Sequence, residues 1–410
     1  MIKTQRLSEE KRASAKFLLP SLAISYFATV PPAILVSLLL IDIGDTFNRS
    51  VGVTGQIQTA ASLVGAISAV LVGALSVRFN YKSLLLLGLL FINITALGCA
   101  VSLNFALMLI AFSLSGLGIN IVEPMLFSLV GEHFPLEKRT NAIGWVLTGV
   151  SLSSLIGAPI IGFIVSLEFG NWRLAFLMYV LPVSLLGIAM AAKGVPTPSQ
   201  QPHHPIVKGK YLEGFKEIFT NRSAMMCLVG AALSIAGFQA IVLYGASYFR
   251  QRFQLSIEYV SFLFPVFSLC YIFGNQISSR VVNQYGRKLI TVLSAFFAGI
   301  LVISFMNVPN IWLAYLFTCL GGMLFGMLAT ASFSLTLEQV PRFRGTMMSL
   351  RSASTSMGAA LGAGVGGLAL FWWDFESVGI ALGALSIAAA IIFNILVFDP
   401  TSTDSYASQS

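Results

Sequence analysis

The stretch that decides the fold is SLLLLGLLFINITALGCAVSLNFALMLIAFSLSGLGINIV, residues 83–122, which contains no charged side chain. A helix needs about 20 apolar residues to cross the hydrocarbon core of a bilayer. This run is twice that length, so we expect two spans joined by a turn at Ser102-Leu103-Asn104. Residues 289–337 have the same character, and we expect their turn at Asn307-Val308-Pro309-Asn310, because proline and asparagine end helices.

The composition extends this interpretation to the whole chain. Of the 410 residues, 56% are hydrophobic and 10% are charged, whereas soluble domains have about 25% charged residues. This balance excludes a soluble enzyme and a disordered chain. We therefore predict an all-α polytopic membrane protein with twelve transmembrane helices. The expected spans are residues 17–41, 54–77, 83–102, 105–130, 141–167, 172–192, 224–249, 259–281, 288–306, 310–337, 345–371 and 376–398.

The basic residues predict how the spans are oriented. Loops on the side of the N-terminus carry 19 of the 24 lysines and arginines, and four lie on the opposite side. Because lysine and arginine are retained in the cytoplasm, we expect both termini there, which requires an even number of spans. The net charge of +8 is thus explained by the lipid bilayer of a cell (cytoplasmic or inner) membrane, and nucleic acid is not an expected partner.

The chain divides into two similar halves. LVGEHFP at residues 129–135 aligns with LTLEQVP at 335–341, and FNYK at 79–82 aligns with YGRK at 285–288, both at an offset of 206. Such repeats are a recurring transporter architecture, with the site at the interface between the repeats. We expect two pseudo-symmetric six-helix bundles, residues 1–193 and 223–410. The linker, residues 194–222, is expected on the cytoplasmic side and contains a short amphipathic helix.

The loop after the second span carries a family resemblance. GALSVRFNYK at residues 73–82 resembles the signature G-x-L-x-D-R-x-G-R-K of the major facilitator superfamily, and within it the chain resembles the twelve-span drug:proton antiporter branch. Val77 replaces the acid that, in the family, takes part in a cytoplasmic charge cluster latching the two halves. The resemblance therefore implies an altered latch. Its expected members are Arg78, Lys82, Glu132, Arg139, Arg287, Lys288, Glu338 and Arg344.

Span 5 resembles the signature associated with exporters in this family. The residues that carry it are Gly149, Gly157, Pro159 and Gly162. Gly149, Ser153 and Gly157 are four apart and form one face of small residues that lets helices pack closely, and Pro159 bends the helix. Ordinary helix packing explains the same spacing, so the export direction rests on the resemblance.

Span 4 resembles a third family signature but lacks its arginine, because Phe112 occupies that position. The family links this arginine to proton transfer, so protons would need another route. Two charged residues lie within spans, Glu123 and Arg351, and each costs about 2.5–3.5 kcal/mol at the middle of a helix. Their similar depth suggests that they meet across the two halves when the inner gate is shut. Alternatively, Arg351 snorkels to the interface and Glu123 is protonated.

Other polar residues have weaker assignments. Asn120 and Gln239 are candidates for a central substrate cavity, or for hydrogen bonds between helices. Asp42 and Asp45 could meet a cationic substrate or a proton at the outer end of span 1, or be solvated acids. The four cysteines lie in apolar runs and indicate packing, no histidine lies in a span, and we expect no cofactor or metal. The G-x-G-x-x-G match at residues 362–367 lies inside an apolar span, which excludes a dinucleotide site.

The sequence thus predicts a secondary active transporter that works by alternating access and carries out no covalent chemistry. The family resemblance implies proton-coupled export of small hydrophobic or amphipathic molecules, and we expect a monomer. An uptake permease or facilitator without proton coupling is the alternative that the altered signatures favour. A membrane enzyme or sensor is disfavoured, because the membrane interior contains only one acid and no histidine.

Overall fold

The computed structural model describes residues 17–75, 79–134, 136–196 and 208–400. Within these residues, twelve helices are long and apolar enough to cross a bilayer, as predicted. They run over Phe17–Leu38, Val51–Val72, Tyr81–Ala100, Phe105–His133, Ala142–Ser166, Trp172–Gly194, Arg222–Phe253, Ile257–Val282, Arg287–Asn307, Ile311–Leu337, Pro341–Trp372 and Phe375–Leu396.

Several spans are built from more than one helical element. The first is formed by helical residues 17–27 followed by α2 (Pro31–Leu38), and it continues into α3 (Leu40–Thr46). The remaining elements of the first half are α4 (Val51–Thr54), α5 (Gln56–Leu75), α6 (Tyr81–Ala100), α7 (Phe105–His133), α8 (Leu136–Ser166), α9 (Trp172–Ala175), the π-helix η1 (Phe176–Val180) and α10 (Leu181–Gly194). After these come α11 (Lys208–Thr220), α12 (Arg222–Val242), α13 (Gly245–Phe253), α14 (Ile257–Tyr285), α15 (Arg287–Asn307), α16 (Ile311–Leu337), the 3₁₀-helix η2 (Pro341–Phe343), α17 (Arg344–Trp372) and α18 (Phe375–Leu396).

Both predicted turns in the long apolar runs are confirmed. Helix α6 ends at Ala100 and α7 begins at Phe105, where the Asn104 side chain accepts a hydrogen bond from the Leu107 amide. Helix α15 ends at Asn307, and the Asn310 side chain caps α16 in the same way. Asparagine fixes these turns because its side chain satisfies an amide that a helix start leaves unpaired.

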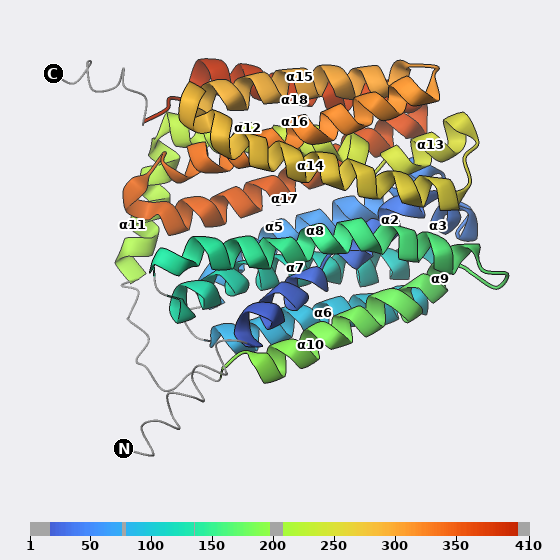
Figure 1. Cartoon of the computed structure of the whole chain (residues 1–410), viewed down its shortest axis with the longest axis horizontal. Helices are drawn as coiled ribbons and strands as arrows, with labels where there is room; N and C mark the ends of the chain where they lie inside the picture. Colours follow the sequence, from blue (N-terminus) through green and yellow to red (C-terminus); the bar gives the residue numbers. More distant parts are fainter. Residues whose placement is uncertain (1–16, 76–78, 135, 197–207, 401–410) are drawn as a thin grey trace.

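The helices form two bundles that lie side by side (Figure 1). The helices from residue 17 to α10 form one bundle, and α12–α18 form the other, which we call the N bundle and the C bundle. They meet along two seams, α5 against α17 and α8 against α14. One end of the molecule, the terminal face, holds α11 and the end of α18, and the other, the distal face, holds α3, α9 and α13.

The outside of the bundles is apolar, as a lipid-facing surface must be. Large exposed side chains include Ile67, Phe163, Phe273 and Ile395, each more than half exposed. Contiguous apolar surface on this scale would be insoluble in water but costs nothing in a bilayer.

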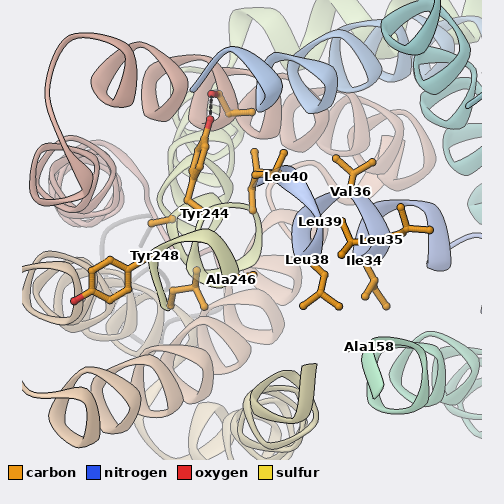
Figure 2. Close-up of a cluster of buried hydrophobic side chains, with 14 of the residues drawn as sticks. Ile34, Leu35, Val36, Leu38, Leu39, Leu40, Ala158, Tyr244, Ala246 and Tyr248 are labelled. Carbon is orange, nitrogen blue, oxygen red and sulfur yellow. Dashed lines mark hydrogen bonds between the residues drawn. The ribbon is translucent and has the colours of Figure 1, made fainter. Parts of the chain in front are cut away.

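The buried core joins the bundles in the distal half and not in the terminal half. One large cluster contains Leu35 and Phe176 of the N bundle together with Tyr248 and Phe305 of the C bundle, and part of it is shown in Figure 2. Three smaller clusters near the terminal face each belong to one half of the chain. Because a continuous dry core excludes water, the passage between the bundles is closed on the distal side in this structure.

Candidate functional site

Glu123 and Arg351 approach each other from opposite bundles. Glu123 lies in α7 and Arg351 in α17, and their charges are close enough to interact electrostatically. Among the described residues, neither takes part in an ion pair within 4.0 Å. Glu123 is partly exposed, whereas Arg351 is only 9% exposed. The structure therefore brings the two charges near each other but keeps them apart.

Neutral groups of its own bundle hold the Arg351 side chain. Its Nη1 atom donates to the Thr336 hydroxyl at 2.8 Å and to the Ser332 carbonyl at 3.3 Å, and Nη2 donates to the Ser332 hydroxyl at 3.1 Å. The guanidinium also lies 5.5 Å from the centre of the Phe333 ring. A buried cation that has only neutral partners is costly unless an anion compensates its charge. Glu123 of the opposite bundle is the acid whose charge, when it is ionised, acts on Arg351.

Tyr26 and aromatic residues of the C bundle lie near the two charges. Tyr26 lies beside Glu123, and Tyr271 of α14 interacts with Arg351. The Tyr271 ring stacks on Phe238 of α12 at 5.5 Å between ring centres, and Phe238 in turn lies 4.9 Å from Phe325 of α16. Three helices of the C bundle thus place an aromatic wall next to the charged pair.

The two amide candidates for the cavity make contacts between helices. Asn120 is buried, and its Oδ1 accepts hydrogen bonds from the hydroxyls of Ser356 at 3.1 Å and Ser352 at 3.5 Å, both in α17 of the other bundle. Gln239 is buried and donates to the Ala359 carbonyl at 3.3 Å, which joins α12 to α17. Asn120 therefore connects the bundles at mid-membrane, and Gln239 acts within one bundle.

Three described members of the expected charge cluster, Lys82, Glu338 and Arg344, have partners within their own bundle. Lys82 donates to the carbonyls of Ala192 and Val195 at 2.8 and 2.6 Å, which places a cation at the C-terminus of α10. Glu338 pairs with Arg344 at 2.7 Å within the C bundle. Glu132 is exposed, and Arg287 and Lys288 are partly buried. Arg78 and the side chain of Arg139 lie outside the described residues.

The glycines of α8 mark places of close helix contact. A side chain at Gly149 would meet the Ala23 carbonyl of the first span, and one at Gly162 would meet Ser261 of α14 in the other bundle. Gly157 faces Tyr179 and Ile34, and Pro159 lies inside the helix. This stripe therefore packs α8 against both its own bundle and the C bundle.

The sequence reasoning missed a set of contacts that joins the bundles at the distal face. Asp42 pairs with Arg250 through both carboxylate oxygens, and the Ser37 hydroxyl donates to the Val242 carbonyl. Within the C bundle, the Tyr244 hydroxyl donates to the Ala363 carbonyl at 2.5 Å, the bond drawn as a dashed line in Figure 2, and the Tyr244 ring lies against Gly55 of the N bundle. The repeat offset was the available signal. Asp42 and Arg250 are 208 residues apart, close to the offset of 206, so they end equivalent spans with opposite charges.

Among the residues that the structure describes, no group of three histidine, cysteine or acidic side chains could hold a metal ion. The structure thus offers two opposite charges and an aromatic wall at the place where two helical bundles meet.

Comparisons with known proteins agree with this architecture. The sequence profile of the Major Facilitator Superfamily matches residues 21–264 and again 246–409. An uncharacterized MFS-type transporter, YceJ, from Bacillus subtilis is 23% identical over 81% of this chain and 84% of its own length. A probable sugar efflux transporter from Helicobacter pylori is 25% identical, over 86% of this chain and 88% of its own.

A crystal structure of a D-xylose-proton symporter superposes with a TM-score of 0.78 at 14% identity, over 94% of this chain and 99% of that one, which shows a shared fold. Because the family profile covers almost all of the described residues, the chain belongs to the Major Facilitator Superfamily, and it is a membrane transporter rather than an enzyme.

Proposed function

We propose that this chain exports small hydrophobic or amphipathic molecules in exchange for protons, by alternating access, with both termini in the cytoplasm. The observation that carries the proposal is the pair of opposite charges, Glu123 and Arg351, which lie near each other on opposite bundles without pairing while the distal side is closed. Export by alternating access needs a second state, with the terminal side closed, in which α7 and α17 come closer together.

In that second state an ionised Glu123 pairs with Arg351, and a protonated Glu123 does not. A charge pair at 4 Å in surroundings of effective dielectric constant about 20 gains about 4 kcal/mol, before the cost of desolvation. Even a third of that gain shifts the two-state equilibrium about tenfold. Protonation from outside thus favours the state open to the cytoplasm, and loss of the proton inside favours the return, which is the sequence of events in proton exchange.

The groups around Glu123 suit this role. Tyr26 comes from the first span, Tyr271 from α14 and Arg351 from α17, and Cys227 of α12 also acts on Arg351. Arg351 is the one permanently charged group in this set. The charge state of the site is therefore decided by one titrating carboxylate, because tyrosine and cysteine are neutral near pH 7.

Two features support an amphipathic cargo that moves outward. The aromatic wall of Phe238, Tyr271 and Phe325 offers apolar contact to a cargo molecule, near the charged side chains of Glu123 and Arg351. The glycine and proline pattern of α8 resembles that of exporters, and the name of one relative includes efflux.

The test is transport by the purified protein in proteoliposomes that contain a pH-sensitive dye. Cargo is drawn from a panel of amphipathic compounds to which a strain overexpressing the protein becomes less susceptible. With the wild-type protein, we expect cargo movement to be accompanied by proton movement in the opposite direction. Glu123→Gln should abolish proton movement, and Glu168→Gln, the same change at an exposed distal acid, should not. Wild-type coupling in Glu123→Gln would refute the assigned role.

One observation favours a second function, uptake or facilitated diffusion without protons. Phe112, which occupies the position of the family's proton-linked arginine, is 1% exposed and belongs to the shared apolar core. In the same assay, cargo movement without a response of the pH-sensitive dye would indicate this second function.

A further inference from the structure

We propose that Tyr244 and the Asp42–Arg250 ion pair are the gating residues of the distal face, and that the ion pair and the contact of the Tyr244 ring with Gly55 must both break each time the passage opens on that side. This inference concerns the path of the cargo and does not depend on its identity, on its direction or on proton coupling. It rests on three contacts between the bundles at the distal face: the Asp42–Arg250 pair, the bond from Ser37 to Val242 and the close approach of Tyr244 to Gly55.

The ion pair connects the distal ends of two equivalent spans. Asp42 lies in α3, which continues the first span, and Arg250 lies in α13, which continues the seventh. Both carboxylate oxygens accept from the guanidinium, and the Nη2–Oδ1 distance is 3.1 Å. The side chains are 28% and 16% exposed, so the pair is largely shielded from water. Bidentate pairing in such surroundings is specific in direction and stronger than a surface contact.

Solvent reaches this region from outside. A vestibule of about 380 Å³ opens at the distal face, and residues of both bundles line it. Its walls include Ile41 and Gln251, the sequence neighbours of Asp42 and Arg250. The ion pair therefore lies close to the boundary between the vestibule and the dry core.

Tyr244 fills the next layer inward. It lies between α12 and α13, is fully buried, and donates its hydroxyl to the Ala363 carbonyl of α17. Its ring occupies space left by glycines on both sides. A side chain at Gly366 in the C bundle would collide with the ring, and one at Gly55 in the N bundle would come within 3.0 Å of its Cε1 atom. Tyr244 is thus a plug held by one bundle and seated against the other.

Glycine backbones complete the seal beside the plug. A side chain at Gly52 of α4 would meet the Gly367 carbonyl of α17, and one at Gly367 would meet the Gly52 carbonyl and the Gln56 side chain. Only glycine permits backbones to touch in this way. The G-x-G-x-x-G pattern at residues 362–367 therefore has a packing role: Gly362 faces Ala236, and Gly367 forms the seam.

The ion pair, the contact of Tyr244 with Gly55 and the Gly52–Gly367 seam form a gate because each joins a residue of the N bundle to one of the C bundle. Contacts inside a bundle can persist through a transport cycle, whereas contacts between bundles on the closed side must separate. Together, an ion pair, a plug and a backbone seam make a barrier without a covalent bond. The free-energy cost of opening this barrier is then the loss of the ion pair and the exposure of one buried tyrosine to water.

The experiment measures opening directly and needs no cargo. In a background in which the four native cysteines are replaced, Ser37→Cys serves as reporter, because Ser37 is 2% exposed and lies in the seal. A membrane-impermeant maleimide is applied to intact cells. We expect Asp42→Asn, Arg250→Gln and Tyr244→Ala each to speed labelling about tenfold or more, and the exchange Asp42→Arg with Arg250→Asp to restore slow labelling.

Matched controls use neighbours that do not bridge the bundles. Asp45→Asn removes an exposed acid of the same element, and Arg252→Gln removes an arginine that pairs with Glu376 inside the C bundle. With either control substitution, we expect the Ser37→Cys reporter to be labelled at the same rate as in the protein that carries the reporter alone. A cysteine at exposed Ser50 should label fast in every background, which verifies that the distal face is outside.

The proposal is wrong if the Ser37→Cys reporter is labelled no faster with Asp42→Asn than with Asp45→Asn. It is also wrong if the exchange of the two charges fails to return labelling to its slow rate. Either result leaves proton-coupled export untouched, since that function is tested at Glu123 with cargo present. Conversely, wild-type proton coupling in Glu123→Gln would not contradict the gating role proposed for the distal residues.

Discussion

Replacing single glycines by alanine distinguishes the contacts that hold the distal gate closed from the contacts that stabilise the fold. Gly52→Ala places a methyl group against the Gly367 carbonyl and 3.1 Å from both the Leu370 Cβ and the Phe371 amide nitrogen, all in the opposite bundle. Gly116→Ala places the same group against the Ala61 carbonyl, but here α7 and α5 belong to one bundle. In both cases the nearest obstructing atom is a backbone carbonyl oxygen, which cannot rotate away.

The energetic costs of the two substitutions have the same origin, but they appear in different equilibria. Forcing a methyl group into a closely packed contact costs about 1–3 kcal/mol. For Gly52→Ala the bundles can relieve the clash by separating at the distal face, so the cost shifts the gate towards its open state by roughly 5- to 150-fold. For Gly116→Ala the clash is relieved only by loosening the N bundle, so the cost lowers the stability of the fold.

Two assays distinguish these outcomes. Pulsed electron–electron distance measurements between spin labels at Ser50 and Trp373 report distal separation, because both residues line the vestibule from opposite bundles. Thermal unfolding in detergent reports stability. We expect Gly52→Ala to lengthen the distance with little change in the unfolding temperature, and Gly116→Ala to do the reverse. If Gly52→Ala unfolds as early as Gly116→Ala and leaves the distance distribution unchanged, the seam is static packing and the reasoning fails.

Three further predictions follow from single contacts. Arg351→Gln should abolish proton coupling measured with the dye while Arg351→Lys retains part of it, because lysine keeps the charge but cannot reproduce the three hydrogen bonds to Ser332 and Thr336. Asn310→Ala should lower stability in thermal unfolding by about 1 kcal/mol, because it removes the cap of α16; a larger loss in transport than in stability would contradict a capping role. Lys82→Met should leave distal labelling of the Ser37→Cys reporter unchanged, because its partners Ala192 and Val195 lie in the same bundle.

The two ends of the molecule differ in the contacts that they make between the bundles. At the terminal face, Glu338 pairs with Arg344 within the C bundle, and the apolar clusters beneath them are separate. At the distal face, Asp42 and Arg250 join the two bundles, and the apolar core is shared between them.

The amino-acid sequence by itself determined the number of spans and their boundaries. A long uncharged run is stable in lipid as a helix, because a helix satisfies all its backbone hydrogen-bonding groups internally. Asparagine caps mark where the chain turns between two helices. These are local properties, so they can be read without knowing what each helix touches. The charges Glu123 and Arg351 could be found in the same way, because a charged group within an apolar run stands out by its cost.

Only the tertiary structure decided which of these residues meet. Asn120 looked like a cavity residue because it is polar and at mid-membrane, yet its bonds go to serines of α17, and no pattern along the chain specifies that distance or direction. Tyr244 resembled any buried aromatic residue until glycines from two bundles were found around it. Contacts between bundles depend on the relative placement of two groups of helices, and sequence periodicity within one helix carries no information about that placement.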